Sequence, residues 1–133
     1  MVKAKKARIG IMSEKLIRER MLAIAKGVYN PKDNEPKVWY TSLSALSQVL
    51  CPKNIDLLRM IESSKPETMA DLAELSGRSP SNLSATLNKL KEKGFVSFEE
   101  RGKTKKPIAL FTDFEIVTDS EIEASISQLC HAA

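Results

Sequence analysis

Apolar residues recur every three to four positions along most of the chain, which is the spacing of one face of an α-helix. This repeat predicts helices over residues 13–26, 42–50, 53–64, 68–76, 79–93 and 120–130. Two segments after residue 94 partly alternate apolar and polar residues and are rich in aromatic and β-branched types, which is typical of strands. The pattern therefore predicts a mainly helical chain with a small β element.

The helix at residues 13–26 has signals at both ends, because Ser13 is placed as its N-cap and Gly27 can close it. Its apolar face consists of Ile17, Met21, Ile24 and Val28. Such a face needs a partner surface. Before this helix, residues 1–8 form a basic arm for which disorder and DNA contact both stay open, and IGIM is either a short strand or the approach to the helix.

Residues 29–40 read YNPKDNEPKVWY, and their prolines and Asp-Asn pair rule out regular structure over most of the stretch. We expect a connector in which Trp39 or Tyr40 docks on the core.

Two short helices joined by a glycine-containing turn lie in the middle of the chain. Thr68 begins the first helix and Gly77 ends it. Ser79 caps the second helix, and Pro80 occupies its first position, where a missing N–H is harmless. Its inner face repeats at i, i+4 and i+7 and consists of Leu83, Leu87 and Leu90. This is the sequence outline of a helix-turn-helix.

A β-hairpin is expected at residues 95–111, because FVSFEE and PIALFT flank the polar run RGKTKK. A strand or extended segment follows at 114–117. The expected fold class is mainly α with a small β-hairpin wing (α+β), a winged helix-turn-helix with flanking N- and C-terminal helices. The expected segments are an arm, helix and connector at 1–40, the winged helix-turn-helix at 41–112, and an acidic, helical, dimerising extension at 113–133.

Composition and charge narrow the range of possible functions. The chain has 133 residues, enough for one domain with appended elements. Its net charge of +4 is unevenly spread, at +6 over 1–40, −2 over 41–77, +5 over 78–106 and −5 over 107–133. Two basic blocks favour a polyanion-binding face, with ordinary solvated helix surfaces as the alternative.

Other function classes find little support. No apolar run approaches the roughly 20 residues of a membrane span, and no signal peptide is evident, so we expect a cytoplasmic protein without membrane contact. Cys51, Cys130 and His131 lack the spacing of a zinc site or a catalytic pair. There is no glycine-rich phosphate loop. We therefore expect no enzyme activity, metal or cofactor.

The outer face of the helix at 79–93 carries short polar residues, which are mediocre helix formers. In a helix-turn-helix the second helix lies in the major groove, where such side chains donate to and accept from base edges. The predicted base contacts are Ser81, Asn82, Ser84, Ala85 and Asn88. The predicted DNA backbone contacts are Thr68, Arg78, Ser79, Lys89, Lys103, Lys105 and Lys106. Arg101, on the hairpin tip, is expected to enter the adjacent minor groove.

The segment DLAELSGRSPSNLSATLNKLKEKGFVSFEERGKTKKPIALF resembles the winged helix-turn-helix of MarR-like and ArsR-like bacterial and archaeal transcriptional regulators. The resemblance extends over roughly residues 55–111. It rests on Leu72-Ala73, Gly77, the run from Ser79 to Ser84, Leu87, Leu90 and the run from Lys93 to Val96. It implies a sequence-specific regulator of double-stranded DNA, with the recognition helix 79–93 in the major groove and the wing 99–106 on the minor groove or backbone.

MarR-like proteins dimerise through N- and C-terminal helices outside the winged helix, and the helices at 13–26 and 120–130 occupy those places here. The resemblance therefore implies a homodimer, with recognition helices about 34 to 36 Å apart on a palindromic operator. We expect the protein to repress transcription.

The segment LAIAKGVYNPKDNEPKVWYTSLSALSQVL resembles the N-terminal part of small MarR-like proteins that are encoded beside toxin genes and resemble antitoxins and autorepressors. The alternative function is thus an antitoxin-type interaction module that neutralises a partner toxin, with or without autorepression. RNA binding is disfavoured, because the basic segments lack aromatic stacking platforms.

Overall fold

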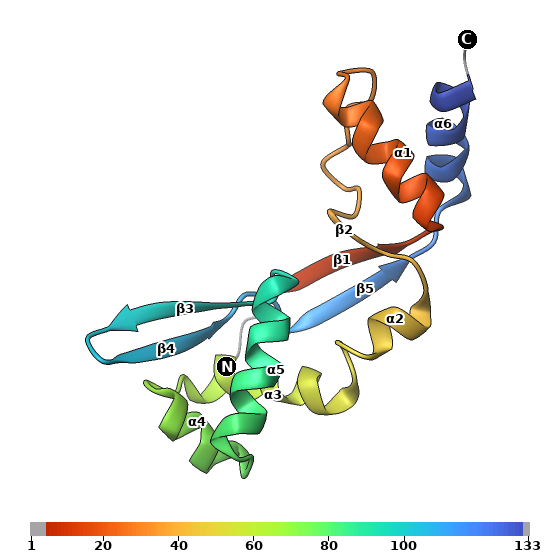
Figure 1. The fold of residues 1–133 in the computed structure, drawn as a ribbon. Helices are drawn as coiled ribbons and strands as arrows, with labels where there is room; N and C mark the ends of the chain where they lie inside the picture. Colours follow the sequence, from red (N-terminus) through yellow and green to blue (C-terminus); the bar gives the residue numbers. More distant parts are fainter. Residues whose placement is uncertain (1–4, 132–133) are drawn as a thin grey trace. The chain divides into compact units, whose positions relative to one another are not determined.

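The computed structural model describes residues 5–131, and Figure 1 shows their course. The elements in chain order are β1 (Lys6–Ile11), α1 (Glu14–Ala25), β2 (Val38–Tyr40), α2 (Leu43–Ser47), α3 (Pro52–Ser64), α4 (Met69–Ser76), α5 (Pro80–Glu92), β3 (Val96–Arg101), β4 (Thr104–Ala109), β5 (Asp113–Val117) and α6 (Ser120–His131). Helices form most of the regular structure, and β3 and β4 form the hairpin that follows the helix-turn-helix. The expected fold class, a winged helix-turn-helix with flanking helices, is confirmed.

The chain divides into two compact units. The first unit holds Gln48–Asp113 with the residues up to Ala7, and the second holds Arg8–Ser47 with the residues from Phe114 onward. These bounds differ from the expected segments 1–40, 41–112 and 113–133, because elements from both ends of the chain pack together in the second unit.

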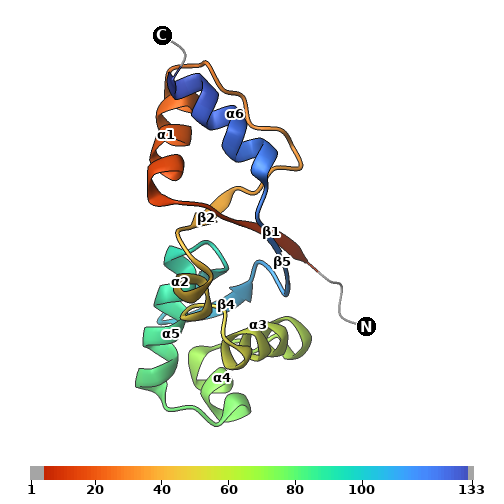
Figure 2. The same ribbon diagram turned by 90° about the vertical axis from the view of Figure 1, so that its right-hand side faces the viewer.

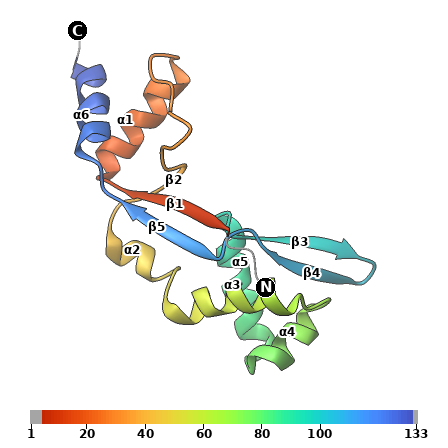
Figure 3. The same cartoon turned by 180° about the vertical axis from the view of Figure 1, so that it is seen from behind.

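The first unit is built from α3, α4, α5 and the β3–β4 hairpin, which can be followed in Figure 3. α4 packs against α3 and α5, β3 against α5, and β4 against α3 and α4. Its fully buried side chains include Leu58, Leu72, Leu83, Leu87, Leu90 and Phe95. The rings of Phe95 and Phe111 meet edge to face, with 6.4 Å between their centroids. One apolar core thus holds both α5 and the hairpin.

The second unit contains a three-stranded sheet in the order β2-β1-β5. β1 and β2 run parallel, with Ile9 opposite Val38 and Ile11 opposite Tyr40. Disorder of the basic arm is the wrong expectation here, because residues 6–8 belong to β1. Residues 38–40 form β2, and the rest of the connector lacks helix and strand as expected. Parallel pairing joins segments far apart in the sequence, so the local pattern does not distinguish a strand from a helix approach at IGIM and gives no sign of β2. Residues 1–4 of the arm lie outside the described residues.

Trp39 packs directly on Gly10, its neighbour across the β1–β2 ladder. A Cβ atom at Gly10 would lie 2.2 Å from Cζ3 of Trp39. The Arg20 guanidinium lies over the same ring, with 5.4 Å between its Cζ and the ring centroid. The docking of Trp39 therefore requires a residue without a side chain at position 10.

A buried ion pair joins α1 to the connector. The Nε of Arg20 donates to Oε1 of Glu35 at 2.9 Å, and both residues are buried. The hydroxyl of Tyr29 donates to Oε2 of Glu35 at 2.8 Å. Burial, together with the adjacent carboxylate, raises the pKa of Tyr29 to about 12. The connector is thus held by polar contacts that are shielded from water.

The apolar stripe of α1 faces away from its own unit. α1 packs against α6 (Figure 2), yet the buried residues of α1 are Arg20 and Ala23. Met21 is 64% exposed and Val28 is 58% exposed. Leu22 and Ile24 of the same helix are also exposed, as is Leu129 on α6. The described residues therefore leave an apolar surface on α1 uncovered.

Lys5 links the start of the described chain to the first unit. Its Nζ donates to Oε2 of Glu62 at 2.9 Å and to the carbonyl of Ala109 at 3.2 Å. This ammonium group holds the pKa of Glu62 below its ordinary value.

Replacing Gly10 with alanine should destabilise the second unit by about 1 to 3 kcal/mol, because the new Cβ overlaps the ring of Trp39. Urea denaturation followed by far-UV circular dichroism measures the change. In a Trp39→Leu background the same substitution should cost less, because a leucine leaves room at this position. An equal cost in both backgrounds would contradict the contact.

Replacing Glu62 with glutamine should lower the free energy of unfolding at neutral pH by about 1 kcal/mol and flatten its decline in acid. The pKa of Glu62 is lower in the folded state. Its contribution is therefore complete above the unfolded glutamate pKa of about 4.3 and is lost as the pH falls through the lower folded value. Urea denaturation from about pH 7 down to about pH 2 tests this.

The control for that series is Glu92→Gln, an exposed carboxylate at the end of α5. It should keep the wild-type decline in acid. A Glu62→Gln profile that parallels the wild type over the whole range would show that the pair with Lys5 does not stabilise the fold.

Candidate nucleic-acid interface

The helix-turn-helix is defined by its caps. The Oγ1 of Thr68 accepts from the backbone N–H of Asp71 at 3.0 Å and starts α4, which ends at Gly77 in the left-handed region with a φ of 71°. The Oγ of Ser79 accepts from the backbone N–H of Asn82 at 3.2 Å, with Pro80 following it at the first position of α5. Both N-caps are those predicted from the sequence. The turn between the helices is accordingly tight.

The inner face of α5 fixes which side of the helix is exposed. Leu83, Leu87 and Leu90 are each 0% exposed. The five predicted base contacts, Ser81, Asn82, Ser84, Ala85 and Asn88, are all exposed on the other sides of the helix, and so is Lys89. The structure therefore gathers them on one accessible helix surface.

The side chains on this outer face have little to bind within the protein. The Oγ of Ser81 lies 3.4 Å from the Oγ of Ser79. Asn82, Ser84 and Asn88 make no side-chain hydrogen bond to any other residue of the described range 5–131. Their donors and acceptors are thus available to a ligand.

The wing is a two-stranded antiparallel hairpin in which Arg101 pairs with Thr104 next to the turn. Gly102 adopts a φ of 63° in that turn, and Lys103 beside it is exposed. The Nζ of Lys105 lies 4.2 Å from the ring centroid of Phe98, and the Nζ of Lys91 lies 5.6 Å from it. Phe98 thus links a cation of α5 to a cation of the wing.

A groove of about 490 Å³ lies between the start of α4 and the wing. Its lining includes Thr68, Met69, Ala70, Lys103 and Lys105. Three of the predicted backbone contacts, Thr68, Lys103 and Lys105, therefore meet at one place. Lys103, Lys105 and the positive end of the α4 dipole bring positive charge to this groove, and Glu100, which also lines it, brings one carboxylate.

Arg78 occupies a second position beside the turn. Its Nη2 donates to the backbone carbonyl of Lys53 at 3.0 Å, and both residues line a hollow of about 340 Å³. The sequence patterns did not mark Lys53 as a candidate. It lies at the start of α3, and only the fold brings it to Arg78.

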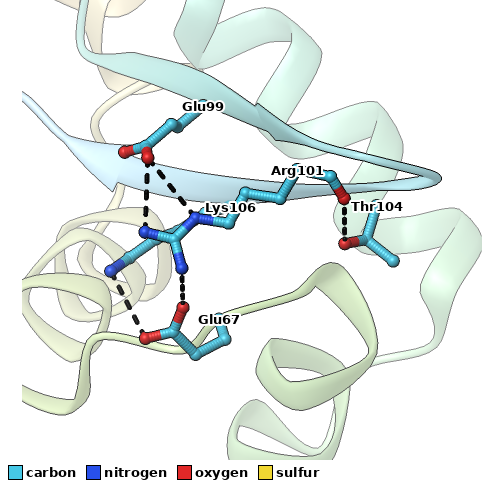
Figure 4. A network of polar contacts seen from close by, with 5 residues as sticks. All are labelled: Glu67, Glu99, Arg101, Thr104 and Lys106. Carbon is cyan, nitrogen blue, oxygen red and sulfur yellow. Dashed lines mark hydrogen bonds and ion pairs between the residues drawn. The ribbon is translucent and has the colours of Figure 1, made fainter.

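Arg101 and Lys106 are held in a network with two carboxylates (Figure 4). A guanidinium nitrogen of Arg101, Nη1, donates to Glu67, and its Nη2 donates to Oε1 of Glu99 at 3.2 Å. The Nζ of Lys106 lies 3.5 Å from Oε1 of Glu67. Two of the four wing cations are therefore paired inside the protein. Glu67 was missed from the sequence because its contact with the wing is long-range. Glu99 lies two residues before Arg101, on the same side of a strand, and this spacing could have identified it.

Neither a metal-binding cluster nor a membrane-spanning helix occurs among residues 5–131. These residues contain no cluster of three His, Cys, Asp or Glu side chains that would hold a metal ion. Within the same range no helix combines the length and the apolar character required to cross a membrane.

Comparisons with known proteins give one family assignment. No curated protein matches the chain. The crystal structure of the predicted DNA-binding transcriptional regulator from E. coli is similar to it, with 16% identity and a TM-score of 0.43 over 86% of this chain and 97% of that chain. The model of the HVO_A0114 family matches residues 49–116, more than half of the chain. That range contains α3, α4, α5 and the hairpin. The chain therefore belongs to the HVO_A0114 family.

Proposed function

We propose that this protein is a sequence-specific regulator of transcription that binds double-stranded DNA and acts as a repressor. In this proposal α5 lies in the major groove, and the β3–β4 hairpin lies against the adjacent backbone. The observation that carries it is the outer face of α5, where Asn82, Ser84 and Asn88 are exposed and make no side-chain hydrogen bond to other residues of the described range. The resemblance of residues 55–111 to MarR-like and ArsR-like winged helices supports the same function.

The residues of α5 suit base edges. Ser81 and Asn82 lie in its first turn, the part of a recognition helix that meets the bases. Asparagine can pair bidentately with adenine, and the methyl group of Ala85 suits the methyl group of thymine. Ser84 and Asn88 follow Ser81 at helical spacing, so they continue along the same side.

The backbone contacts flank this helix. Phosphates would bind in the groove that Thr68 shares with Lys103 and Lys105, and beside Arg78 and Lys53. These contacts supply affinity and register without sequence information. A protein bound in this way also keeps other proteins from the same base pairs, which is the reason for assigning repression.

Selection of bound duplexes from a random DNA pool should enrich one sequence class. On the enriched site, Asn82→Ala should lose about 1 to 3 kcal/mol of discrimination at one base pair and little elsewhere. Lys103→Ala should weaken binding to all sequences and reduce the slope of log affinity against log salt by about 1. Fluorescence anisotropy with single-base variants of the site measures both effects.

The matched control is Asn30→Ala, which removes an exposed asparagine from the second unit. It should bind as the wild type does. If Asn82→Ala weakens every sequence equally, its assignment to base readout is wrong, and a pool without enrichment would overturn the specific regulator.

The second part of the proposal is a homodimer formed through the uncovered surface of α1. Met21 and Val28 are exposed there, with Leu129 of α6 also exposed in the same unit. Lys15 and Arg18 of α1 pair with Glu19 and Glu14 of the same helix, so the exposed apolar side chains carry this interface. A second copy of the chain presents the same exposed apolar side chains of α1 and α6, and a two-fold interface requires such a self-complementary surface.

Sedimentation over a range of protein concentrations should show a dimer for the wild type. Met21→Lys should raise the dissociation constant at least about tenfold, because a charge would be buried in the interface. Ser44→Lys adds the same charge at an exposed position of α2 and should leave the dimer intact. A monomeric wild type, or identical behaviour of the two variants, would exclude this interface.

A further inference from the structure

We propose that Glu67 is a built-in competitor of DNA phosphate, which neutralises Arg101 and Lys106 in the free protein and is displaced when the wing binds DNA. This inference rests on the proposed function. It concerns the regulation of the same surface and gives Glu67 a role that is separate from base readout.

The geometry places one carboxylate against two wing cations. Oε2 of Glu67 accepts from Nη1 of Arg101, and Oε1 of Glu67 lies 3.5 Å from Nζ of Lys106. The two cations come from different strands, β3 and β4. A carboxylate held by both of its oxygens in this manner occupies the place in which a phosphate would bridge the same cations.

A second carboxylate completes the neutralisation. Oε1 of Glu99 lies 3.2 Å from Nη2 of Arg101. The formal charges of Glu67, Glu99, Arg101 and Lys106 cancel. This network of four side chains is therefore electrically balanced in the free protein, although the segment around it is basic.

The ion pair between Arg101 and Glu67 is exposed enough for a DNA phosphate to replace the carboxylate. The side chain of Arg101 is 45% exposed and that of Glu67 is 56% exposed, whereas that of Lys106 is 18% exposed, so Arg101 is the cation that exchanges most readily. Ion pairs at such exposure are weak, because water competes for both partners. A phosphate carries comparable charge and geometry, and its binding also releases counterions from the DNA, which a carboxylate of the protein does not provide. Exchange of Glu67 for phosphate is therefore favourable only when DNA is present.

The position of Glu67 keeps it close to where the phosphate would bind. It directly precedes Thr68, the N-cap of α4, and the groove lined by Thr68, Lys103 and Lys105 begins there. The positive end of the α4 dipole stabilises the Glu67 carboxylate in this location. Release of Arg101 to DNA would thus require only a local movement of side chains.

The test compares Glu67→Gln with Glu74→Gln. Both substitutions remove one negative charge from the α4 region, but Glu74 is exposed and forms no ion pair within residues 5–131. Binding of a mixed-sequence duplex is measured by fluorescence anisotropy at several salt concentrations. Glu67→Gln should bind about three- to tenfold more tightly than the wild type, with a salt slope steeper by about 0.9, and Glu74→Gln should change far less.

A third variant identifies the cation. In an Arg101→Gln background, Glu67→Gln should lose most of its gain, because the group that it releases is absent. Thermal unfolding followed by circular dichroism verifies that every variant is folded.

The outcomes separate the two proposals. Equal effects of Glu67→Gln and Glu74→Gln overturn the competitor role, and so does weaker binding by Glu67→Gln, which would mean that Glu67 holds the wing in its binding geometry. Binding by Glu67→Gln without binding by the wild type supports the role. If no variant and no wild-type protein binds any duplex, the proposed function itself fails.

Discussion

The burial of three leucines on one side of α5 is the constraint on which the interface depends. Leu83, Leu87 and Leu90 are inaccessible to water, and a helix held at three successive turns cannot rotate without exposing them. The opposite side must then face solvent whatever its composition. Serine and asparagine on that side make α5 a poorer helix, and the caps at Ser79 and Pro80 offset part of this cost. Packing of the leucines therefore determines where the polar side chains of α5 point. The hydrogen-bonding groups of those side chains determine which ligands α5 can bind.

The elements of the first unit could be predicted because their signals are local. A cap, a glycine stop and a leucine repeat lie within a few residues of one another, so Thr68, Gly77 and Ser79 identify both helices of the helix-turn-helix without knowledge of the fold. The hairpin is equally local, since its strands are joined by one turn. The groove between α4 and the wing is formed by these elements. Its lining combines residues of both segments, so neither segment alone predicts it.

Long-range partners were not predictable in the same way. Arg101 was expected on the hairpin tip, where it would enter the minor groove, and the sequence did not show that the fold pairs it with Glu67 and Glu99. In the second unit, β1 and β2 carry no alternation that marks them, and their pairing depends on Trp39 fitting over Gly10. The apolar face of α1 was visible in the sequence, whereas its exposure was not, because the buried positions of α1 are those of Arg20 and Ala23. A periodic pattern shows which residues share a face and does not show what covers it.

The discontinuity of the second unit has a consequence for synthesis on the ribosome. Residues 48–113 are contiguous, so nearly all of the helix-turn-helix and its wing can form as soon as that stretch has emerged. Residues 8–47 emerge earlier, but they must wait for β5 and α6 before their unit is complete. During this interval the nascent chain carries α1 without the helix that packs against it. Residues 8–47 are therefore made before the helix-turn-helix, but their unit is completed after it. A chain interrupted after residue 113 would retain the helix-turn-helix and would lack α6 and most of β5.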